Sequence, residues 1–238
     1  MSRLYLIRHG QAGPRDDYDR LSALGELQSQ LLGRYLVSHG VHFAAAYVGR
    51  LSRQRRTAEA VRDEYERAGR AFPDLIEDRL WDEFDLGDVY RELAGLLSED
   101  DPRFRQEFDA MMAAIENGDG EIHRNHNYCD IAIVRAWTTS RYPYSGESWF
   151  DFRARIAKPR QALTRFGSRE NLAVFTSATP IGIWMGDALS LTEPEIWRLA
   201  GATYNSGIST FRVAEDDLRV FIFNSLPHLA DASMWSFR

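Results

Sequence analysis

The residues with the clearest chemical potential follow an apolar stretch near the start of the chain. Leu4 to Ile7 is continuously apolar and leads directly into Arg8-His9-Gly10-Gln11. Such a short apolar run is typical of a strand buried on both faces in a mainly parallel sheet. Open α/β sheets bind ligands at the carboxyl ends of these strands, where a glycine lets a ligand approach closely. The pattern predicts a ligand site here, against the simpler interpretation that His9 only completes the strand end.

A group of arginines opens a helix further along the chain. Residues 49–58 contain Arg53, Arg55 and Arg56 and lead into an amphipathic segment. Cations at the N-terminus of a helix oppose its macrodipole, so the cluster suggests that an anion binds nearby. We expect Arg53 to point inward, and Arg55 and Arg56 to belong to a solvated basic face.

A second turn that could bind an anion follows the strand expected over Leu172 to Thr176. The next residues are Ser177-Ala178-Thr179-Pro180, in which Thr179 is the predicted N-cap and Pro180 the predicted first residue of a helix. Free backbone N–H groups at such a turn face the carboxyl edge of the sheet and favour an anion there.

A carboxyl group with apolar neighbours provides a candidate acid. Glu83 lies in Trp81-Asp82-Glu83-Phe84, and apolar surroundings favour the protonated form of a carboxyl group. Glu83 could therefore act as a general acid, although a surface glutamate fits the residues alone equally well.

An α/β fold would position these candidates at one edge of a sheet. A helix is expected from about Leu24 to His39, with Ser22 as its N-cap. Further strands are expected over residues 41–48, 208–213 and 218–223, the last two as an antiparallel pair. We predict a three-layer sandwich with a mainly parallel central sheet flanked by helices, in one domain spanning residues 1–238.

Residues 88–145 are expected to form a helical insertion in this domain. Ser98 is the predicted cap of a helix that has Pro102 in its first turn and ends at Asn117-Gly118. An exposed strand or helix in the insertion could also serve to form a homodimer.

Four residues within the insertion could in principle bind zinc or iron: His123, His126, Cys129 and Asp130. Their spacing matches no standard metal signature, so we expect polar loop residues and no metal site.

The composition narrows the classes of protein to be considered. The chain has 238 residues, 44% hydrophobic and 27% charged, which fits one sizeable α/β core. Its net charge of −6 gives no support to a general nucleic-acid or anionic-membrane surface. Cys129 is the single cysteine, so no intrachain disulfide forms. No stretch resembles a membrane span or a signal peptide, and a cytoplasmic protein with no nucleic-acid or membrane partner is expected.

Taken in order, the segments resemble the histidine phosphatase superfamily, the phosphoglycerate mutase-like group. The resemblance covers most of the chain outside the insertion. Single segments such as Arg-His-Gly are weak signals, but their combination in this order is specific. The matching segments are Arg8-His9-Gly10-Gln11, Tyr18 to Gly25, Leu51 to Ala58, Glu83 with Gly87, Gly146-Glu147-Ser148, and Asn224 with Pro227-His228-Leu229.

The resemblance implies a metal-independent phosphatase that needs no cofactor. His9 would be the nucleophile and would form a phosphohistidine, and Glu83 would act as general acid and base. Arg8, Arg53 and Gln11 would bind the phosphoryl group. The substrate would be a phosphomonoester or phosphohistidine on a small molecule or a protein. A mutase is disfavoured, because the mutase pattern resembles Arg-His-Gly-Glu-Ser and this chain continues differently.

One position departs from the family pattern. Family members usually have Ser-His-Gly after the third strand, whereas this chain has Ser177-Ala178-Thr179. Losing one donor to the transition state would lower turnover by about 10²- to 10³-fold, by analogy with an oxyanion hole. Three explanations stay open: Thr179 and the N–H groups of its helix replace the histidine, the protein is a phosphate-ester sensor or partner-binding module with weak catalysis, or Ala178 was introduced to trap a ligand.

Overall fold

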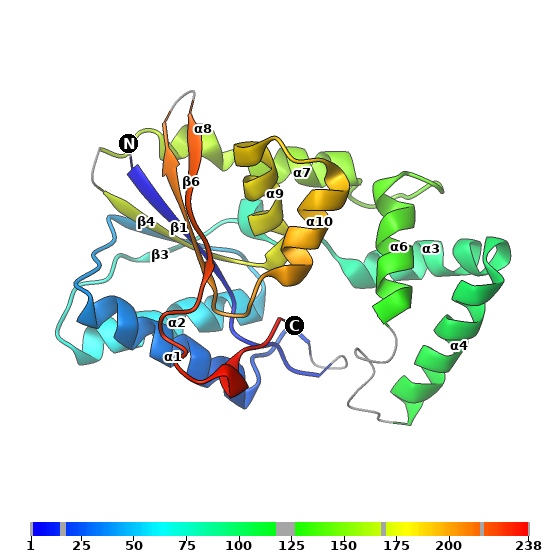
Figure 1. Ribbon diagram of the computed structural model, residues 1–238, viewed down its shortest axis with the longest axis horizontal. Coiled ribbons are helices and arrows are strands. Elements are labelled where there is room, and N and C mark those ends of the chain that lie inside the picture. The colour runs from blue at the N-terminus through cyan, green and yellow to red at the C-terminus, as the bar shows by residue number, and fades with distance from the viewer. Residues whose placement is uncertain (1, 15–17, 118–126, 168–169, 215–216, 238) are drawn as a thin grey trace. The chain divides into compact units, whose positions relative to one another are not determined.

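A six-stranded sheet organises the larger of the two units into which the chain divides (Figure 1). The computed structural model describes residues 2–14, 18–117, 127–167, 170–214 and 217–237. The sheet unit comprises Met1–Glu83 and Arg155–Arg238, and the helical unit comprises Phe84–Ala154. The helical unit is thus inserted between two parts of the sheet unit, which confirms the predicted helical insertion. That the whole chain acts as one domain stays a prediction.

The strands lie in the order β3-β2-β4-β1-β5-β6, and their directions are mixed but mostly parallel. The strands β3, β2, β4 and β1 are parallel to one another. Strand β5 pairs antiparallel with both β1 and β6, and the pairing of β5 with β6 is the one predicted. The bounds are Ser2–Arg8 for β1, Ala45–Val48 for β2, Leu75–Glu77 for β3, Asn171–Thr176 for β4, Ile208–Val213 for β5 and Leu218–Ser225 for β6.

The second strand is shorter than the strand expected over residues 41–48. The N–H group of Val41 donates to the carbonyl of Leu36 and so completes the end of the preceding helix. Gly40, at φ +62°, provides the left-handed conformation that this helix end requires. An apolar residue after such a glycine therefore belongs to the helix end, which the apolar pattern alone did not reveal.

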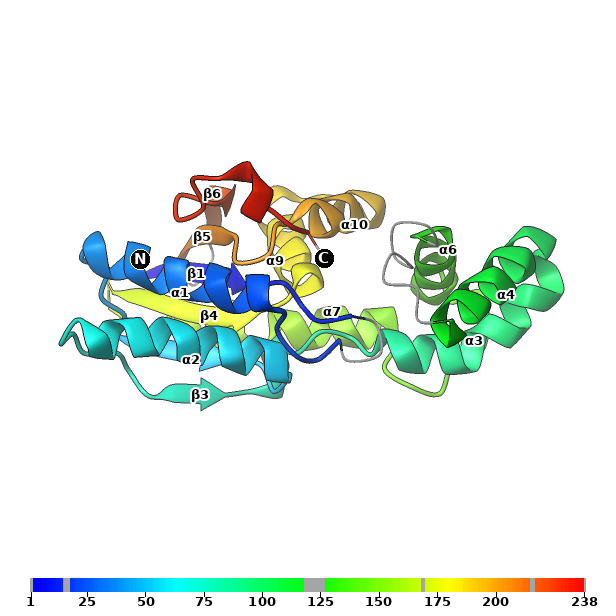
Figure 2. The same ribbon diagram turned by 90° about the horizontal axis from the view of Figure 1, so that it is seen from below.

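Helices cover both faces of the sheet (Figures 1 and 2). On one face, α1 (Ala23–Ser38) and α2 (Ser52–Arg67) share a core cluster with Tyr5 and Ile7 of β1. On the other face, Trp184 of α9 (Ala178–Leu189) meets Phe211 of β5, with ring centroids 6.0 Å apart. Phe211 pairs with Leu4 of β1, and alternate residues of a strand face opposite ways. The predicted three-layer arrangement is confirmed.

The remaining helices of the sheet unit complete these layers. α10 (Glu193–Ala202) packs against α9, and α8 (Pro159–Leu163) precedes β4. Two single turns, η2 (Arg79–Trp81) and η3 (Ala232–Met234), precede the candidate acid and the end of the chain, respectively. No helix in the described part of the chain is long and apolar enough to cross a membrane.

The helix after β4 begins two residues earlier than predicted. Ser177 is the N-cap residue and Ala178 is the first helical residue, so the prediction that Thr179 is the N-cap is wrong. Pro180 is tolerated as the third helical residue because the first four N–H groups of a helix have no partner within it. The N-cap prediction for Ser22 is confirmed, since its side chain accepts from the N–H group of Gly25 at 3.0 Å.

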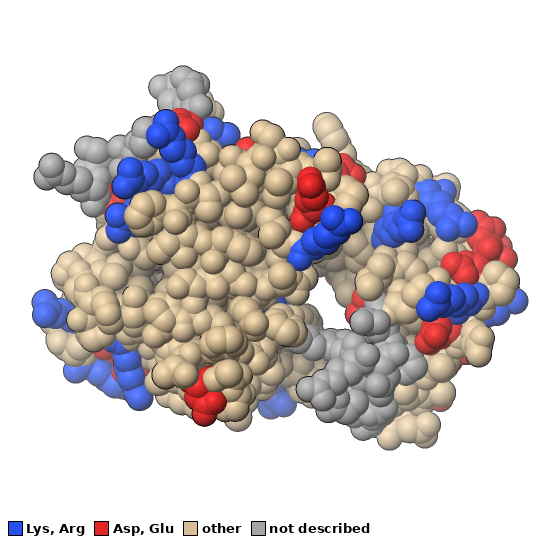
Figure 3. Space-filling view, in the orientation of Figure 1, with Lys and Arg blue, Asp and Glu red and all other residues tan. Residues whose placement is uncertain are grey.

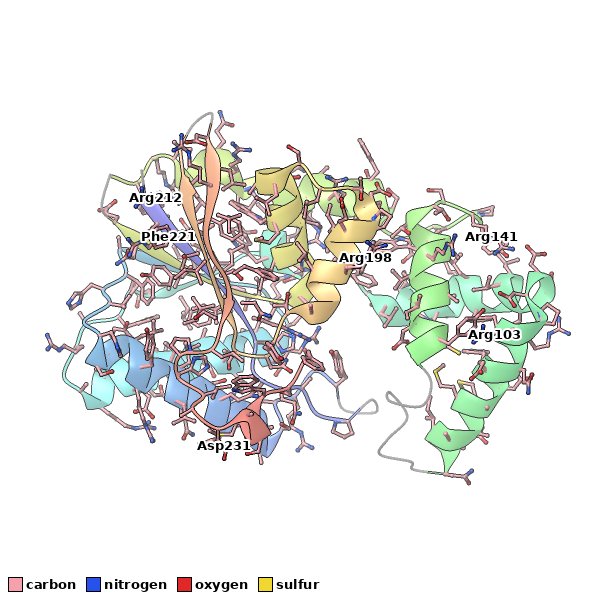
Figure 4. All side chains as sticks on the ribbon, viewed as in Figure 1. Arg103, Arg141, Arg198, Arg212, Phe221 and Asp231 are labelled. Atoms are coloured by element: carbon pink, nitrogen blue, oxygen red, sulfur yellow. The ribbon has the colours of Figure 1, made fainter. Side chains whose placement is uncertain are left out.

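The helical unit contains α3 (Leu86–Asp100), α4 (Pro102–Glu116), α6 (Asn127–Thr138) and most of α7 (Trp149–Ala157). Ser98 does not cap the helix that contains Pro102, because it lies inside α3. The cap is Asp101, whose carboxylate accepts from the N–H groups of Arg103 and Phe104. Arg103, labelled in Figure 4, also stacks over the ring of Tyr128, 4.1 Å from its centroid.

The residues considered as metal ligands are only partly described. His123 and His126 lie outside the described residues. Cys129 and Asp130 belong to α6, so the prediction of a loop is wrong for them; Cys129 is buried and Asp130 accepts from the hydroxyl of Tyr90 at 2.7 Å. Within the described ranges, no three His, Cys, Asp or Glu side chains converge as a metal site would require.

At Gly25, the backbone of α1 packs directly against the loop that follows β1, at Gln11. A Cβ atom at this position would lie 2.1 Å from the carbonyl oxygen of Gln11. Gly95 of α3 provides a matched control, since a Cβ atom there would meet nothing within 4 Å.

We therefore expect Gly25→Ala to destabilise the protein by about 1–3 kcal/mol, because overpacking outweighs the helix propensity gained. Gly95→Ala is expected to stabilise it by about 0.5–1 kcal/mol. Urea unfolding of both variants measures the difference. Equal stabilisation by the two substitutions would show that the loop and α1 are not in close contact.

Candidate active site

His9 lies directly after β1 and is buried, with 2% of its surface exposed. Its Nδ1 atom is 2.7 Å from the carbonyl oxygen of Gly10, so this nitrogen carries a proton and donates it to the carbonyl. The Nε2 atom accepts a hydrogen bond from the Nε–H group of Arg53 at 3.2 Å. The lone pair of Nε2, directed toward the guanidinium, is therefore the nucleophilic position of the ring.

The electrostatic surroundings keep this imidazole neutral. Burial lowers the pKa of His9 well below its usual range, and the positive charges of Arg53 and Arg8 lower it further. Because a neutral ring retains its lone pair, the same charges that would attract a phosphate also preserve the nucleophile.

Arg8 is a buried cation with an incomplete set of partners. Its Nη1 group donates to the carbonyl of Thr203, whereas its Nε–H group is buried and finds no acceptor among the described residues. Burial lowers the pKa of Arg8, which Arg53 reinforces and Tyr18 and Glu83 oppose. An anion bound beside this guanidinium would recover part of the hydration that burial removes.

Arg53 comes from the first turn of α2 and points inward as predicted, with 7% of its surface exposed. Its Nη1 group donates to Asp19 at 2.9 Å, and the other oxygen of Asp19 accepts from the N–H group of Ser52 at 3.0 Å. Arg55 and Arg56 lie on the solvated face of α2 and pair with glutamates there, also as predicted.

The Glu83 carboxylate lies at the N-terminus of α9, where it accepts from the N–H group of Thr179 at 3.1 Å. The segment before it is held by Arg155, which donates to the carbonyls of Arg79 and Asp82. Gln54 of α2 donates to both Trp81 O and Ser177 Oγ, which links this segment to the start of α9. The Ser177 hydroxyl therefore accepts from Gln54 and does not cap α9 through its side chain.

Gln11 is fixed by α1 rather than by His9. Its N–H group donates to Gln28 Oε1 at 2.8 Å, and its side-chain oxygen accepts from Ser22 Oγ at 2.7 Å. Gly10 is held on the other side, where its N–H group donates to Thr57 Oγ1 at 3.0 Å. The loop after β1 is thus fastened to both α1 and α2.

The structure brings most of the predicted site residues into one network. His9 accepts a hydrogen bond from Arg53, and Glu83 accepts one from the N–H group of Thr179. The charge of Glu83 also raises the pKa of Arg8, against the larger effect of burial. Gln11 joins through α1, and Ala178 is the partly exposed first residue of α9. The catalytic and binding roles of these residues stay predictions.

Two residues next to Arg53 were not predicted as part of the site. Asp19 pairs with Arg53, and the ring of Tyr18 lies 4.9 Å from the Arg53 guanidinium carbon. Both belong to the segment Tyr18 to Gly25, which is one of the segments that resemble the family. An acidic residue, Asp19, shortly before the helix cap Ser22 was the signal in the sequence that could have indicated them.

Arg8 and His9 at the end of β1 and Arg53 in the first turn of α2 form a buried, positively charged candidate site. Its place at the carboxyl ends of parallel strands is typical of ligand sites in open α/β proteins. The sequence model of the histidine phosphatase superfamily (branch 1) matches residues 4–127 and 119–225 of the chain. The chain belongs to this family, and phosphorylated substrates are implied by it.

Solved structures show the same fold at low sequence identity. Bacillus stearothermophilus YhfR is 21% identical with a TM-score of 0.65, covering 96% of this chain and 99% of that one. A mycobacterial glucosyl-3-phosphoglycerate phosphatase is 17% identical with a TM-score of 0.61, and the match covers 94% of this chain and 100% of that one. The phosphoserine phosphatase of Entamoeba histolytica is 18% identical with a TM-score of 0.59, and the match covers 96% of this chain and 100% of that one. No curated protein matches the sequence.

The basic residues of the site are not part of a broad basic surface on the face drawn in Figure 3. Over the sheet unit this face is mostly uncharged, and its Lys and Arg side chains stand in small groups near the margin.

The lowered pKa of His9 can be measured directly. Because burial and the charges of Arg53 and Arg8 lower the pKa of His9, we expect it to stay neutral at pH values where the histidines of the unfolded chain have already taken up a proton. Nitrogen-15 NMR of the imidazole reports both the protonation state and the tautomer, with the urea-unfolded protein as reference. A midpoint within the usual histidine range would contradict the electrostatic description.

Because Asp19 pairs with Arg53, we expect it to compete with an anionic ligand for that guanidinium. Asp19→Asn removes one negative charge and is expected to tighten the binding of inorganic phosphate by about 2- to 5-fold, the range of a partly exposed ion pair. Glu77→Gln removes a carboxylate that pairs with the exposed Arg55 and should leave phosphate affinity unchanged. Calorimetric titration measures both; weaker binding by Asp19→Asn would show that Asp19 mainly orients Arg53.

Proposed function

We propose that the protein is a metal-independent phosphatase that hydrolyses a phosphomonoester or phosphohistidine through a phosphohistidine intermediate on His9. The observation that carries the proposal is the neutral, buried His9 whose Nε2 lone pair is directed at Arg53. A neutral nucleophile among buried cations suits attack on a phosphoryl group whose charge the cations neutralise.

In the first step, the Arg53 Nε–H group exchanges His9 Nε2 for a phosphoryl oxygen, the freed Nε2 attacks phosphorus, and the bond from phosphorus to the ester oxygen breaks. Glu83 takes up a proton before this step and gives it to the leaving oxygen. Positive charge develops on the imidazole, and the Gly10 carbonyl that accepts from Nδ1 stabilises it. Arg8 and Arg53 neutralise the equatorial oxygens of the transferred group.

In the second step, water attacks phosphorus, the bond between nitrogen and phosphorus breaks, and phosphate leaves. Glu83, now a carboxylate, takes the proton of the attacking water, so both residues return to their initial states. The two-step course replaces one difficult displacement by two easier ones.

We further propose that Ala178 marks a site that lacks the usual second histidine of the family. The N–H group of Thr179 is a candidate substitute donor, and in this structure it donates to Glu83. Because Ala178 is partly exposed at the first position of α9, a larger side chain could be placed there without entering the core.

The test is phosphate release from a panel of phosphomonoesters without added metal. We expect turnover by the chain as given, abolition by His9→Ala, and an increase of about 10²- to 10³-fold in Ala178→His if one donor to the transition state is missing. Phosphorus NMR of the enzyme denatured in alkali, where the bond between nitrogen and phosphorus is stable, would detect the phosphohistidine.

The other outcomes separate the alternatives. Robust turnover with little gain in Ala178→His would mean that Thr179 and the N–H groups of α9 already replace the histidine. Tight binding of phosphate esters, with neither release nor phosphohistidine in any variant, would favour the sensor or partner-binding module. Unchanged turnover in His9→Ala would refute the proposed mechanism.

A further inference from the structure

The connection between α10 and β5, residues 203–207, contacts the backbone of His9. We call it the brace. The N–H group of Ser206 donates to the carbonyl of His9 at 3.1 Å, and Asn205 Nδ2 donates to the same carbonyl at 3.3 Å. Arg8 is held by the same connection, through its N–H group to Gly207 O at 3.1 Å and through its side chain to Thr203 O.

The brace is buried and adopts a conformation that needs support. Thr203, Asn205 and Ser206 have no exposed surface. Ser206 has a φ of +57°, a left-handed conformation that residues other than glycine rarely adopt. Such a conformation persists only where its surroundings fix it.

Three residues from the end of the chain supply that support. His228 Nε2 is 2.8 Å from Ser206 Oγ. Asn224 accepts from the N–H group of Tyr204 and donates to the carbonyl of Ala202, each at 2.8 Å.

The third support, Ser236, also connects the brace to α1. Its carbonyl accepts from the N–H group of Asn205 at 2.7 Å, and its hydroxyl donates to Asn205 Oδ1 at 3.0 Å. Gln28 donates to the same hydroxyl and accepts from the N–H group of Gln11. Asp231, labelled in Figure 4, caps η3 and so shapes the segment that leads to Ser236.

We propose that His228, Ser236 and the brace they fasten are positioning residues for the attack of His9 on phosphorus. The inference rests on the proposed function and assigns the end of the chain a role in the chemical step. His228 fastens the brace at Ser206, whose N–H group holds the His9 carbonyl, whereas the Arg8 side chain is held at Thr203. Loosening the brace at Ser206 would therefore misplace Nε2 while leaving the Arg8 side chain and Arg53 on α2 in place. Misplacement of a reacting group by about 1 Å can lower a rate by about 10²-fold.

Two probes distinguish nucleophile placement from anion binding. Vanadate takes a fifth ligand and so resembles the transition state of phosphoryl transfer, whereas inorganic phosphate needs only the arginines. The ratio of their dissociation constants therefore reports how well Nε2 is placed, without knowledge of the substrate.

The main variants are His228→Leu, which removes the bond to Ser206, and His228→Gln, which can restore it. We expect His228→Leu to lose at least about 10-fold in vanadate affinity and in kcat, with phosphate affinity and KM within about 2-fold. His228→Gln should recover most of the loss. Ser236→Ala, at a partly exposed residue, should change the ratio in the same direction by about 3-fold and covers the case that His228→Leu does not fold.

Tyr65→Phe is the matched control for lost stability. The Tyr65 hydroxyl donates to Val41 O at 2.8 Å, a partly buried bond away from the site, so its loss should leave the ratio unchanged. Equal ratios in wild type, His228→Leu and Ser236→Ala would overturn the positioning role. A wild-type ratio that His9→Ala does not change would instead overturn the proposed function, and the positioning role with it.

Discussion

Two guanidinium groups are buried beside a neutral imidazole, and the surroundings of the site follow from that constraint. A buried cation is strongly unfavourable unless hydrogen bonds or an anion compensate it. Asp19 compensates Arg53, and the carbonyl of Thr203 compensates Arg8, whose Nε–H group has no acceptor in the part of the chain that the structure describes. The sheet supplies rigidity: β1 and β4 end side by side, and the N–H group of His9 donates to Thr176 O at 2.9 Å. The end of β1, beside β4, thus fixes Arg8 and His9, and the first turn of α2 brings Arg53 to them.

Asp19 gives the site a reversible internal counterion. Its carboxylate bridges the guanidinium of Arg53 and the N–H group of Ser52, and so replaces the side-chain cap that Leu51 cannot provide for α2. More than half of the Asp19 side chain is exposed, so solvent weakens its hold and a dianionic ligand can compete. The same contact therefore caps the start of α2 and, under the proposed function, would have to be displaced for phosphate to pair fully with Arg53.

The sequence could predict features that depend on local patterns. The apolar run before Arg8-His9, the Ser22 cap and the inward position of Arg53 are of this kind, because each follows from neighbouring residues. The brace could not be predicted, since its bonds join residues almost 200 positions apart, such as Asn205 and His9. Helix α3 was missed for a related reason. Its cap at Asp85 and the following cap at Asp101 are two acids among many in this region, and only the fold selects them.

Glu83 is the last residue of the sheet unit, and the helical unit begins with the next residue. The nucleophile and both arginines are anchored far from this junction in the chain. Under the proposed function, an insertion, deletion or repacking within the helical unit would therefore affect the proposed acid first, and the residues proposed to bind and attack phosphorus least. Such a division would let the leaving group change in evolution while the phosphoryl chemistry is inherited unchanged.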